Sequence, residues 1–535
     1  MDWPDRVRES RRRPTRTRRS IPDRDFGLGA RCPVDRRPLR PMTASGPLVA
    51  LGALAWVGMG FGPAANLAVA QNEPPASAAS ADGDPFERLQ ARVIETIASA
   101  EGSVAAIARV RRNADPARQD ESFPGSVPNP SDPGFVPNEF GTGVVIDPAG
   151  LILTAYHVLG NPEENDYYVW LNRVPFKAVK VQSVRAADPW MDLAVLHIEA
   201  TDLAPIRFGD ADAVKKGQFV VALGNPSAIA RDGLPSASWG IVSNLARKAV
   251  SPGEGVSEQG RETLHHYGTL IQTDAKVGLG TSGGPLLNLN GEMVGLLVAL
   301  SAGPVYDHAA GFAIPVDAHF KRTVETLKSG KRADFGFLGV LPWTLTRDER
   351  RNGMRGARIR DVVPGTPASR ALLRSGDIIL SVDNHDVYDD HDLIRYVSAN
   401  PPEAQIELTV QRGRELLTQR VRLSKKAVVA ARRPIATVPD PEWRGIRVDY
   451  VTAMAEFPTR SHVLAANPCV GVIEVQQDSP AWRAGIRPGD FIATVGRTRV
   501  DRPADFFAAV DGRSGDVSLG VLVDGRVAQR VIAAP

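Results

Sequence analysis

A serine enclosed by glycines is the first place where this sequence could carry out chemistry. Gly280-Thr281-Ser282-Gly283-Gly284 would form a sharp turn, because glycine tolerates positive φ and the close approach of other groups. Such a turn could hold the Ser282 hydroxyl in a cleft and direct the amides of Gly280 and Ser282 toward one point, as in a nucleophile beside an oxyanion hole. A Gly/Ser cluster can also be an ordinary loop. A catalytic role therefore requires partners, because a serine hydroxyl needs an oriented base to become a nucleophile.

Two such partners lie upstream, each at the edge of a strand-like run. His157 stands in LILTAYHVL, and Asp192 heads the apolar run LAVL. Taken singly, a histidine of this kind is an ordinary core or surface residue, and the aspartate is a turn or strand cap. In the order His, Asp, Ser they predict an imidazole that is oriented by a carboxylate and that activates Ser282.

The same glycine pattern also fits the G-x-S-x-G elbow of α/β-hydrolases, and with it a lipase or esterase. In that fold a helix follows the serine, and the acid and the histidine come later in the chain. Here Pro285, a short apolar run, the turn Asn290-Gly291 and the run MVGLLVAL follow the serine. These indicate a strand, a tight turn and a second strand, so the context argues against the elbow.

Six motifs together resemble the HtrA/Deg family of trypsin-like serine proteases of the cell envelope, which carry C-terminal PDZ domains. They stand in the family's order within residues 85–535: TAYHVL, DLAVL, GNP, IQTDA, GTSGGPL and GFAIP. The resemblance implies an all-β double barrel of the chymotrypsin/trypsin type and a serine endopeptidase that cleaves unfolded or damaged proteins. It also implies that no cofactor or metal is needed, and that the chain forms a homo-oligomer, a trimer or a multiple of one. A catalytically silent PDZ scaffold or a chaperone is the alternative.

The resemblance assigns the catalytic residues. It makes His157, Asp192 and Ser282 the triad, and the amides of Gly280, Thr281 and Ser282 the oxyanion hole. Thr281 stands where family members usually have asparagine, and Gly278-Leu279 stand where they have Asn-Pro or a similar pair. Because the extra glycine, Gly278, could make this loop looser at rest, we hypothesise that the oxyanion hole forms only on activation.

The resemblance also implies a specificity pocket lined by Val277, Leu300 and Ser301. That pocket would accept small or medium apolar side chains, which are buried in folded proteins and become accessible in unfolded ones. Lys276 departs from the family, which tends to have a small residue there. If Lys276 reached the pocket, acidic side chains would be preferred instead.

Short strand-like runs must position these residues. They are Tyr167–Leu171, Ala178–Val184, Leu193–Ile198, Phe219–Leu223 and Ser238–Val242. With hardly any helix among them, they predict a two-barrel all-β core. Helices are predicted before and after this core. The first has Phe86, Leu89, Val93 and Ile97 at helical spacing and either joins subunits or packs on its own barrel; the second spans Val316–Leu327. Residues 111–137 lack periodicity and predict a long loop.

The C-terminal part of the chain repeats itself. Pro367 and Pro480 lie 113 positions apart, as do Gly376 and Gly489, within S/T-P-A and G-D-x-I motifs. A constant offset predicts two copies of one domain. The motifs resemble α+β PDZ domains, which bind C-terminal peptide tails by strand addition and hold the carboxylate with backbone amides.

The two copies differ in the loop that would hold this carboxylate. In the first copy the loop is Phe337-Leu338-Gly339-Val340, which is close to the family pattern. In the second copy it is Trp443-Arg444-Gly445-Ile446, where arginine replaces an apolar residue. The second domain is therefore either a peptide receptor or purely structural.

Charge separates the start of the chain from the rest. The first forty residues hold thirteen arginines and six acids, a net charge of +7, whereas the whole chain carries +3. Residues 71–535 therefore carry −4, which removes the main support for a nucleic-acid partner. Residues 48–70 are apolar and end in an A-x-A pattern, which predicts export to the periplasm or cell envelope with cleavage before Gln71. A retained membrane anchor and a translation start at Met42 are the alternatives.

The predicted organisation has seven parts. They are a basic disordered leader (1–40), a signal peptide or membrane anchor (41–70), a linker (71–84), the protease domain (85–330), the first PDZ domain (335–426), a linker (427–442) and the second PDZ domain (443–535). Processing would leave Cys469 as a single thiol, which we expect to be a small buried apolar residue.

Overall fold

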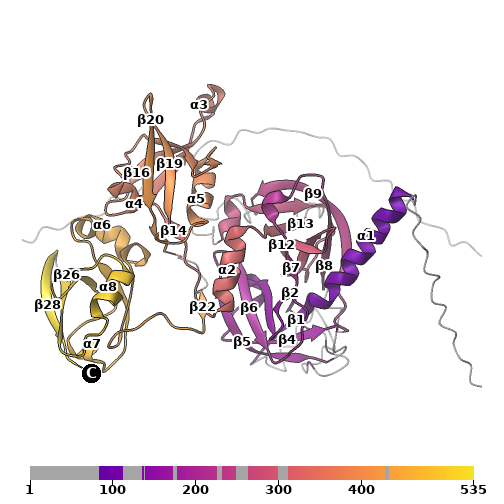
Figure 1. Ribbon diagram of the computed structural model, residues 1–535, viewed down its shortest axis with the longest axis horizontal. Coiled ribbons are helices and arrows are strands. Elements are labelled where there is room, and N and C mark those ends of the chain that lie inside the picture. Colours follow the sequence, from indigo (N-terminus) through magenta and orange to yellow (C-terminus); the bar gives the residue numbers. More distant parts are fainter. Residues whose placement is uncertain are drawn as a thin grey trace, which may run out of the picture. The chain divides into compact units, whose positions relative to one another are not determined.

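The computed structural model describes residues 84–112, 130, 135, 137, 139–172, 177–225, 232–248, 263–298, 311–427, 433–523 and 525–534. The predicted leader, the predicted signal or anchor segment and most of the predicted loop at 111–137 lie outside these residues. Figure 1 labels the helices and strands along the chain.

One seven-stranded sheet forms the first barrel. Its order is β22-β5-β4-β1-β2-β3-β6, and β5 also pairs with β6, which closes the sheet. The strands are β1 (Val104–Arg111), β2 (Glu139–Asp147), β3 (Leu151–Ala155), β4 (Asn165–Leu171), β5 (Val179–Asp188), β6 (Leu193–Ile198) and β22 (Ile435–Ala436). Aliphatic side chains such as Ile107, Ile152 and Leu196 fill its interior. The strand β22 belongs to the segment that the sequence predicted to be a linker between the PDZ domains.

A second seven-stranded sheet forms the second barrel, in the order β11-β8-β9-β10-β13-β12-β7, with β11 also paired to β12. The strands are β7 (Arg207–Phe208), β8 (Phe219–Gly224), β9 (Ser236–Arg247), β10 (Leu270–Thr273), β11 (Pro285–Asn288), β12 (Glu292–Val298) and β13 (Gly311–Pro315). Gly291, with φ +71°, forms the turn between β11 and β12. The strand–turn–strand interpretation after Ser282 is therefore confirmed.

Two helices flank these strands. The helix α1 (Pro85–Ala100) begins after Asp84, whose carboxylate accepts the Phe86 amide. Its later half packs Val93 and Ile97 against the core, whereas Phe86 is 78% exposed. The helix α2 (Ala318–Lys328) begins two residues later than predicted, because the Asp317 carboxylate caps it by accepting the Phe320 amide at 2.7 Å.

The repeat corresponds to two six-stranded sheets of the same order, β15-β16-β17-β19-β20 with β18 beside β17, and β23-β24-β25-β27-β28 with β26 beside β25. The first comprises β15 (Val340–Thr344), β16 (Ala357–Val362), β17 (Ile378–Val382), β18 (His385–Asp386), β19 (Gln405–Arg412) and β20 (Glu415–Arg422). The second comprises β23 (Ile446–Tyr450), β24 (Val470–Val475), β25 (Phe491–Val495), β26 (Thr498–Arg499), β27 (Val517–Val523) and β28 (Arg526–Ile532). A separate two-stranded sheet pairs β14 (Gly336–Phe337) with β21 (Ser424–Lys425).

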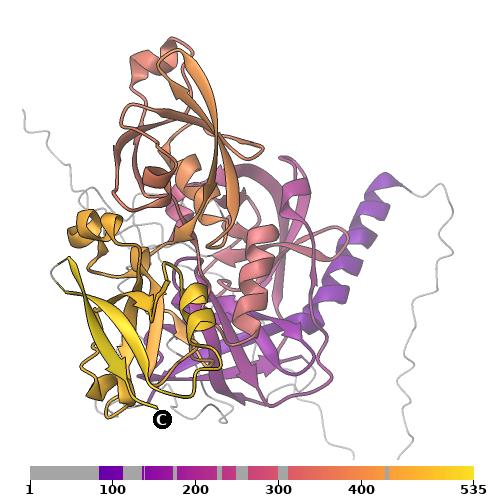
Figure 2. The same ribbon diagram turned by 60° about the vertical axis from the view of Figure 1, so that its left-hand side comes forward.

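One helix packs against the strands of each PDZ sheet, α5 (Asp390–Ser398) in the first copy and α8 (Pro503–Val510) in the second (Figures 1 and 2). The repeated S/T-P-A motif begins a short helix in both copies, α4 (Pro367–Arg370) and α7 (Pro480–Arg483), with the Thr or Ser as N-cap and the proline at the first helical position. The remaining helices are α3 (Arg347–Arg351) and α6 (Phe457–Ala466).

Candidate active site

His157 and Asp192 meet at one edge of the first barrel. His157 lies in the 3₁₀ turn η2 (Tyr156–Leu159), directly after β3, and Asp192 lies in the turn between β5 and β6. The His157 ring nitrogen Nδ1 is 2.7 Å from the Asp192 oxygen Oδ2, and the His157 amide donates to Oδ1 at 2.9 Å. A proton on Nδ1 that faces the carboxylate leaves Nε2 as the basic nitrogen. The pair can therefore act as an oriented general base.

Backbone contacts hold Asp192 in its turn. The Tyr156 amide donates to the Asp192 carbonyl at 3.0 Å, and the buried Asp188 carboxylate accepts the Met191 amide at 2.7 Å. Asp192 itself has φ +54°, a left-handed conformation that is uncommon for residues other than glycine. The strain is tolerated because contacts on both sides fix the turn.

Burial alone would raise the pKa of Asp192, but the charge and hydrogen bonds of His157 outweigh it and lower the pKa. A second histidine, His265, contributes in the same direction. Its Nε2 lies 3.0 Å from the Met191 carbonyl, its Nδ1 lies 2.9 Å from Thr269 Oγ1, and burial lowers its own pKa. Sequence reasoning missed His265, because nothing in the run LHHY marks it as a neighbour of the acid.

The Ser282 loop connects β10 to β11 and is attached to the first barrel. The Thr142 amide of β2 donates to the Ser282 carbonyl at 2.9 Å. A Cβ built on Gly283, which has φ +88°, would lie 2.1 Å from the Thr142 carbonyl oxygen and 2.4 Å from Thr154 Oγ1. Glycine is therefore required here, because only its absent side chain lets the serine loop approach the strand that precedes His157.

The turn before Ser282 is tied down. Both the amide and the hydroxyl of Thr281 donate to the Gly278 carbonyl, at 3.1 and 2.7 Å, and Thr142 Oγ1 donates to the Gly280 carbonyl at 2.6 Å. Gly280 has φ +92° and fits between the Asn225 carbonyl and Phe140. One sequence-based assignment needs correction: the Thr281 amide donates to the Gly278 carbonyl inside the turn and is not an oxyanion donor. The two Thr281 bonds also hold Gly278, the glycine to which the expected looseness of this loop is attributed.

Of the predicted specificity pocket, the described residues include only part. Val277 is half-buried against the core of the second barrel, beside Gly311. Leu300 and Ser301 lie outside the described residues. Lys276 has an exposed side chain, and its carbonyl accepts the Ser238 hydroxyl at 2.9 Å.

The predicted carboxylate loop of the first PDZ domain lines a cavity of about 150 Å³. Phe337, Leu338, Gly339 and Val340 form one wall, and Leu393 and Val397 of α5 form the other. Lys426 also lines this cavity. Its ammonium lies 4.6 Å from the centre of the Trp190 ring, burial lowers its pKa, and among the described residues it has no carboxylate partner. A partly buried ammonium without a carboxylate partner favours an anionic ligand.

The corresponding loop of the second PDZ domain is closed on itself. The amides and carbonyls of Trp443 and Ile446 bond each other reciprocally at 2.9 Å. The Arg444 guanidinium points to four backbone carbonyls at 2.8–3.1 Å, those of Arg513, Gly515, Ile532 and Ala533. The Ile446 amide is therefore already bonded within its own loop.

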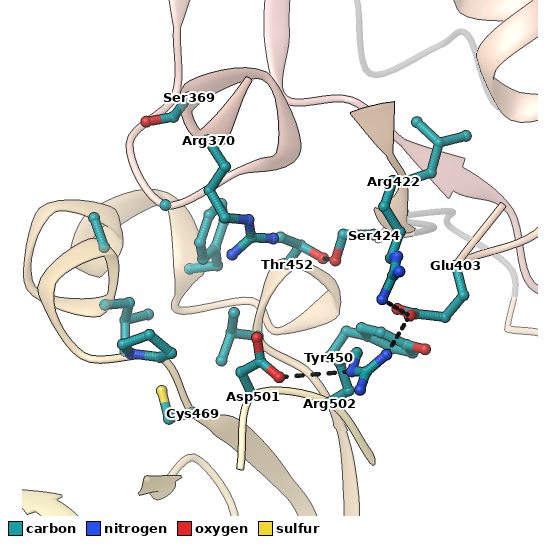
Figure 3. A pocket seen from close by; sticks show the side chains of 17 residues that line it. Ser369, Arg370, Glu403, Arg422, Ser424, Tyr450, Thr452, Cys469, Asp501 and Arg502 are labelled. Carbon is teal, nitrogen blue, oxygen red and sulfur yellow. Dashed lines mark hydrogen bonds and ion pairs between the residues drawn. The ribbon is translucent and has the colours of Figure 1, made fainter. Parts of the chain in front are cut away.

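A larger cavity, of about 450 Å³, is lined by residues of both PDZ domains and is shown in Figure 3. Its charged groups are mostly paired with one another. Glu403 of the first domain contacts Arg502 at 3.0 Å and Arg422 at 4.0 Å, and Arg502 also contacts Asp501 at 3.6 Å. Cys469 lies in its wall, buried as predicted, and burial raises the pKa of its thiol to about 12.

Comparison with known proteins agrees with this architecture. The model of the trypsin-like peptidase domain matches residues 141–296, and two PDZ domain models match residues 336–423 and 471–520. A probable periplasmic serine endoprotease DegP-like of Halomonas elongata is 30% identical over 372 residues, which cover 68% of this chain and 72% of that protein. The chain belongs to the DegP-like family of serine endoproteases.

Other members of the DegP-like family match at similar levels. The periplasmic serine endoprotease DegP of Salmonella typhimurium is 28% identical and covers 71% of this chain and 74% of that protein; the probable DegP-like endoprotease of Chlamydia trachomatis is 28% identical and covers 73% and 74%. Among solved structures, the HtrA-type protease AlgW with a tripeptide is 23% identical with a TM-score of 0.47, covering 62% of this chain and 97% of that chain.

The chain is therefore a serine-type endopeptidase with an all-β, trypsin-like double barrel followed by two PDZ domains. The sequence-based family, fold class and enzyme class are confirmed. In the part of the chain that the structure describes, no helix is long and apolar enough to cross a membrane. The segment 48–70, for which an anchor was considered, lies outside that part.

Proposed function

We propose that His157, Asp192 and Ser282 are the residues with which this endopeptidase hydrolyses peptide bonds. Ser282 Oγ attacks the scissile carbonyl while His157 Nε2 takes its proton, and the imidazolium later protonates the leaving amine. Asp192 fixes the imidazole tautomer and stabilises the cation. The 2.7 Å contact between His157 Nδ1 and Asp192 Oδ2 carries this proposal. The close approach of the Ser282 loop to the strand before His157 supports it.

The amides of Gly280 and Ser282 are the proposed oxyanion donors. Each donor of this kind contributes roughly 3–4 kcal/mol to transition-state stabilisation. The Thr281 bonds to Gly278 support a turn that is already formed before substrate arrives. A preformed turn lowers the barrier because no reorganisation is needed when charge develops.

Unfolded or damaged polypeptides are the proposed substrates, in a protein quality-control role. Val277, half-buried beside Gly311, supports a pocket for small or medium apolar side chains. The exposed side chain of Lys276 speaks against an acidic preference. Mapping the cleavage sites in a denatured protein tests this choice, because frequent cuts after Asp or Glu would contradict it.

The first PDZ domain is the proposed receptor for C-terminal peptide tails. Its cavity combines the backbone of Leu338-Gly339-Val340 with apolar side chains of α5 and the Lys426 ammonium, which match a tail with an apolar last residue and a carboxylate. We further propose that the protein works in the periplasm, where its relatives' names place them, after export through residues 48–70. Assembly as a trimer or a multiple of trimers is proposed as well, and the exposed Phe86 and Ile94 of α1 support a subunit contact.

Digestion of casein tests the catalytic proposal directly. The wild type should cleave casein and react with a fluorophosphonate probe at Ser282, whereas Ser282→Ala should do neither. His157→Ala should also lose both activities, since the hydroxyl then has no base. A control at Ser369, a serine of the first PDZ domain that lies away from the triad, should leave both unchanged when replaced by alanine. Casein cleavage that survives in Ser282→Ala would overturn the assignment.

A further inference from the structure

The segment between the two PDZ domains is built into the protease barrel. Ile435 and Ala436 form the strand β22, which pairs antiparallel with β5 in the register Ile435↔Ala187 and Ala436↔Ala186. At this end β5 already pairs with β6 on its other side, so β22 covers what would otherwise be an open sheet edge. The Ile435 side chain packs against the core of the first barrel. The predicted linker is therefore a structural strand of the first barrel.

Further contacts fasten the same segment on both sides of β22. The amides of Thr437 and Val438 donate to the Gly330 carbonyl at 3.0 and 2.9 Å, and the Thr437 hydroxyl donates to the Arg185 carbonyl at 2.9 Å. Arg332 forms an ion pair with Asp440. Before β22, the carbonyl of Arg433 accepts the Tyr156 hydroxyl at 3.0 Å.

These contacts reach both chain segments that carry the catalytic pair. Tyr156 directly precedes His157, and its amide holds the Asp192 carbonyl. On the other side, β5 ends at Asp188, whose carboxylate accepts the Met191 amide and so closes the turn that presents Asp192. The strand β22 pairs with the end of β5, and a carbonyl just before it accepts the Tyr156 hydroxyl. These contacts constrain the backbone on either side of the catalytic pair, and the separation of these two backbone segments sets the His157–Asp192 distance.

We propose that residues 433–438 are a positioning strap of the protease, which holds His157 and Asp192 in the geometry needed for proton transfer. The strap residues touch no substrate and act through Tyr156 and β5. Placement matters at this scale, because an error of about 1 Å in a catalytic group can cost on the order of 100-fold in rate. The proposal rests on the triad proposed above, and it makes the chain beyond the first PDZ domain part of the catalytic unit.

Hydrogen exchange on the intact wild-type protein tests the docking without any substitution. The amides of Thr437 and Val438 should exchange as slowly as those of β5, because both donate to the Gly330 carbonyl beside a closed sheet. Exchange at the rate of an unstructured linker would overturn the proposal, whatever the outcome for Ser282→Ala. The two proposals can therefore fail separately.

Substitution of Ile435 tests the positioning role. Ile435→Ser should lower kcat about tenfold with KM nearly unchanged, and Ile435→Val should restore it, since a smaller aliphatic side chain still packs on the barrel. The acid limb of the pH–rate profile should also move to lower pH, because an imidazolium farther from Asp192 is less stabilised. Leu416→Ser, at an exposed position on β20 of the first PDZ domain, is the matched control and should keep the wild-type profile.

Tyr156→Phe provides a second test that removes one hydroxyl and leaves the packed ring. It should lower kcat about threefold and shift the acid limb in the same direction, as expected for the loss of a single positioning hydrogen bond. If Ile435→Ser fails to fold, this variant decides the question. Wild-type kcat together with an unshifted acid limb in Tyr156→Phe, or in a folded Ile435→Ser, would overturn the strap.

Discussion

The two PDZ domains share one sheet order and one pair of motifs, yet their carboxylate loops differ in conformation. In the first domain only Gly339 of the loop has positive φ, at +89°. In the second, Arg444 and Gly445 both have positive φ, at +50° and +88°, and the chain curls so that Trp443 and Ile446 bond each other. The loop of the first domain lines a cavity, whereas in the loop of the second domain Trp443 and Ile446 use their backbone groups to bond each other.

Side chains reinforce this difference. In the first domain Leu393 and Val397 of α5 line the cavity. In the second, the Trp443 ring packs edge-on against Phe506 of α8 at a centroid distance of 6.0 Å. At the N-terminus of α8, Arg502 and Tyr450 face Glu403 of the first domain (Figure 3). The two domains therefore share a fold but differ in the few side chains around this loop, and a binding site depends on such side chains.

Adding a methyl group to the equivalent glycine of each loop should affect the two PDZ domains most differently. A Cβ on Gly339 would lie 2.1 Å from Thr366 Cβ, and a Cβ on Gly445 would lie 2.3 Å from Ser479 Cβ. Left-handed strain of about 1–3 kcal/mol adds to either clash. Gly339→Ala should therefore lower the affinity for a free-carboxylate peptide about tenfold to 100-fold, by about 1.4 kcal/mol per tenfold.

Gly445→Ala should destabilise its own domain but leave the peptide affinity unchanged. Both affinities are measured by fluorescence anisotropy in the Ser282→Ala background, so that the peptide is not cleaved, and both unfolding transitions are followed by calorimetry. An equal loss of affinity in the two variants would show that the second domain also binds tails.

Acid should weaken the contact of the first PDZ domain with the protease region. His319 of α2 is buried between Met191 Sδ, at 3.0 Å from Nε2, and the Ala399 carbonyl, at 2.8 Å from Nδ1. Burial, with the charge of Arg322 adding to it, lowers the pKa of His319 to about 4. In the unfolded chain His319 takes up a proton near pH 6.5, so the neutral, buried ring contributes its full share to folding stability above that pH. As the pH falls from 6.5 toward 4 this contribution is lost, which lowers the free energy of unfolding by about 3 kcal/mol in all.

Thermal unfolding of the wild type and of His319→Gln between pH 7.5 and 4 measures this effect. The glutamine does not titrate, so the variant should show a shallower decline over this range. Hydrogen exchange should rise around Ala399 in acid while the core of the second domain stays protected. Parallel declines in the two proteins would assign the acid sensitivity to other groups.

Removal of the Arg444 side chain tests the structural role of the second loop. The Arg444 guanidinium contacts four backbone carbonyls. Because Arg444→Ala removes all four contacts, it should lower the free energy of unfolding of the second PDZ domain by about 2 kcal/mol. Arg444→Lys should recover little, because an ammonium cannot match the planar fork. Chemical denaturation followed by intrinsic fluorescence gives the stability. A gain of peptide affinity in Arg444→Ala would instead mean that the arginine blocks a competent groove.

Lys426 gives the smallest and most specific effect. Lys426→Met keeps the apolar stem and removes the charge. It should therefore lower the affinity for a peptide with a free C-terminal carboxylate about threefold to tenfold, as expected for one charge-assisted contact. A peptide with an amidated C-terminus should bind the wild type and the variant alike. The two peptides are compared by calorimetry. Equal weakening of both would place Lys426 outside the carboxylate site.

Local patterns carried much of the prediction. The apolar run Leu193–Ile198 matched β6, and the helix predicted at Val316–Leu327 is α2, Ala318–Lys328, which begins after its cap at Asp317. The repeat offset of 113 residues matched two domains of equal sheet order, because the same motif builds the same capped helix in each. The order His, Asp, Ser pointed to the trypsin-like class.

Long-range contacts could not be predicted in this way. The strand β22 pairs residues that are more than two hundred positions from their partners on β5, and a short Pro-rich segment gives no periodic signal for such pairing. His265, Lys426 and the hydroxyl of Thr142 gain their roles from neighbours that the chain brings together only on folding.

The family, the type of chemistry and the number of domains can be read from the amino-acid sequence, since they follow from motifs in which every residue is local to its turn or helix. Three features emerge only in the folded chain: the Thr281 amide is bonded inside its turn, the second PDZ loop is closed, and the chain between the PDZ domains forms a strand of the protease. The reason is physical: a hydrogen-bonding group has one set of partners at a time, and only the folded chain chooses which partners those are.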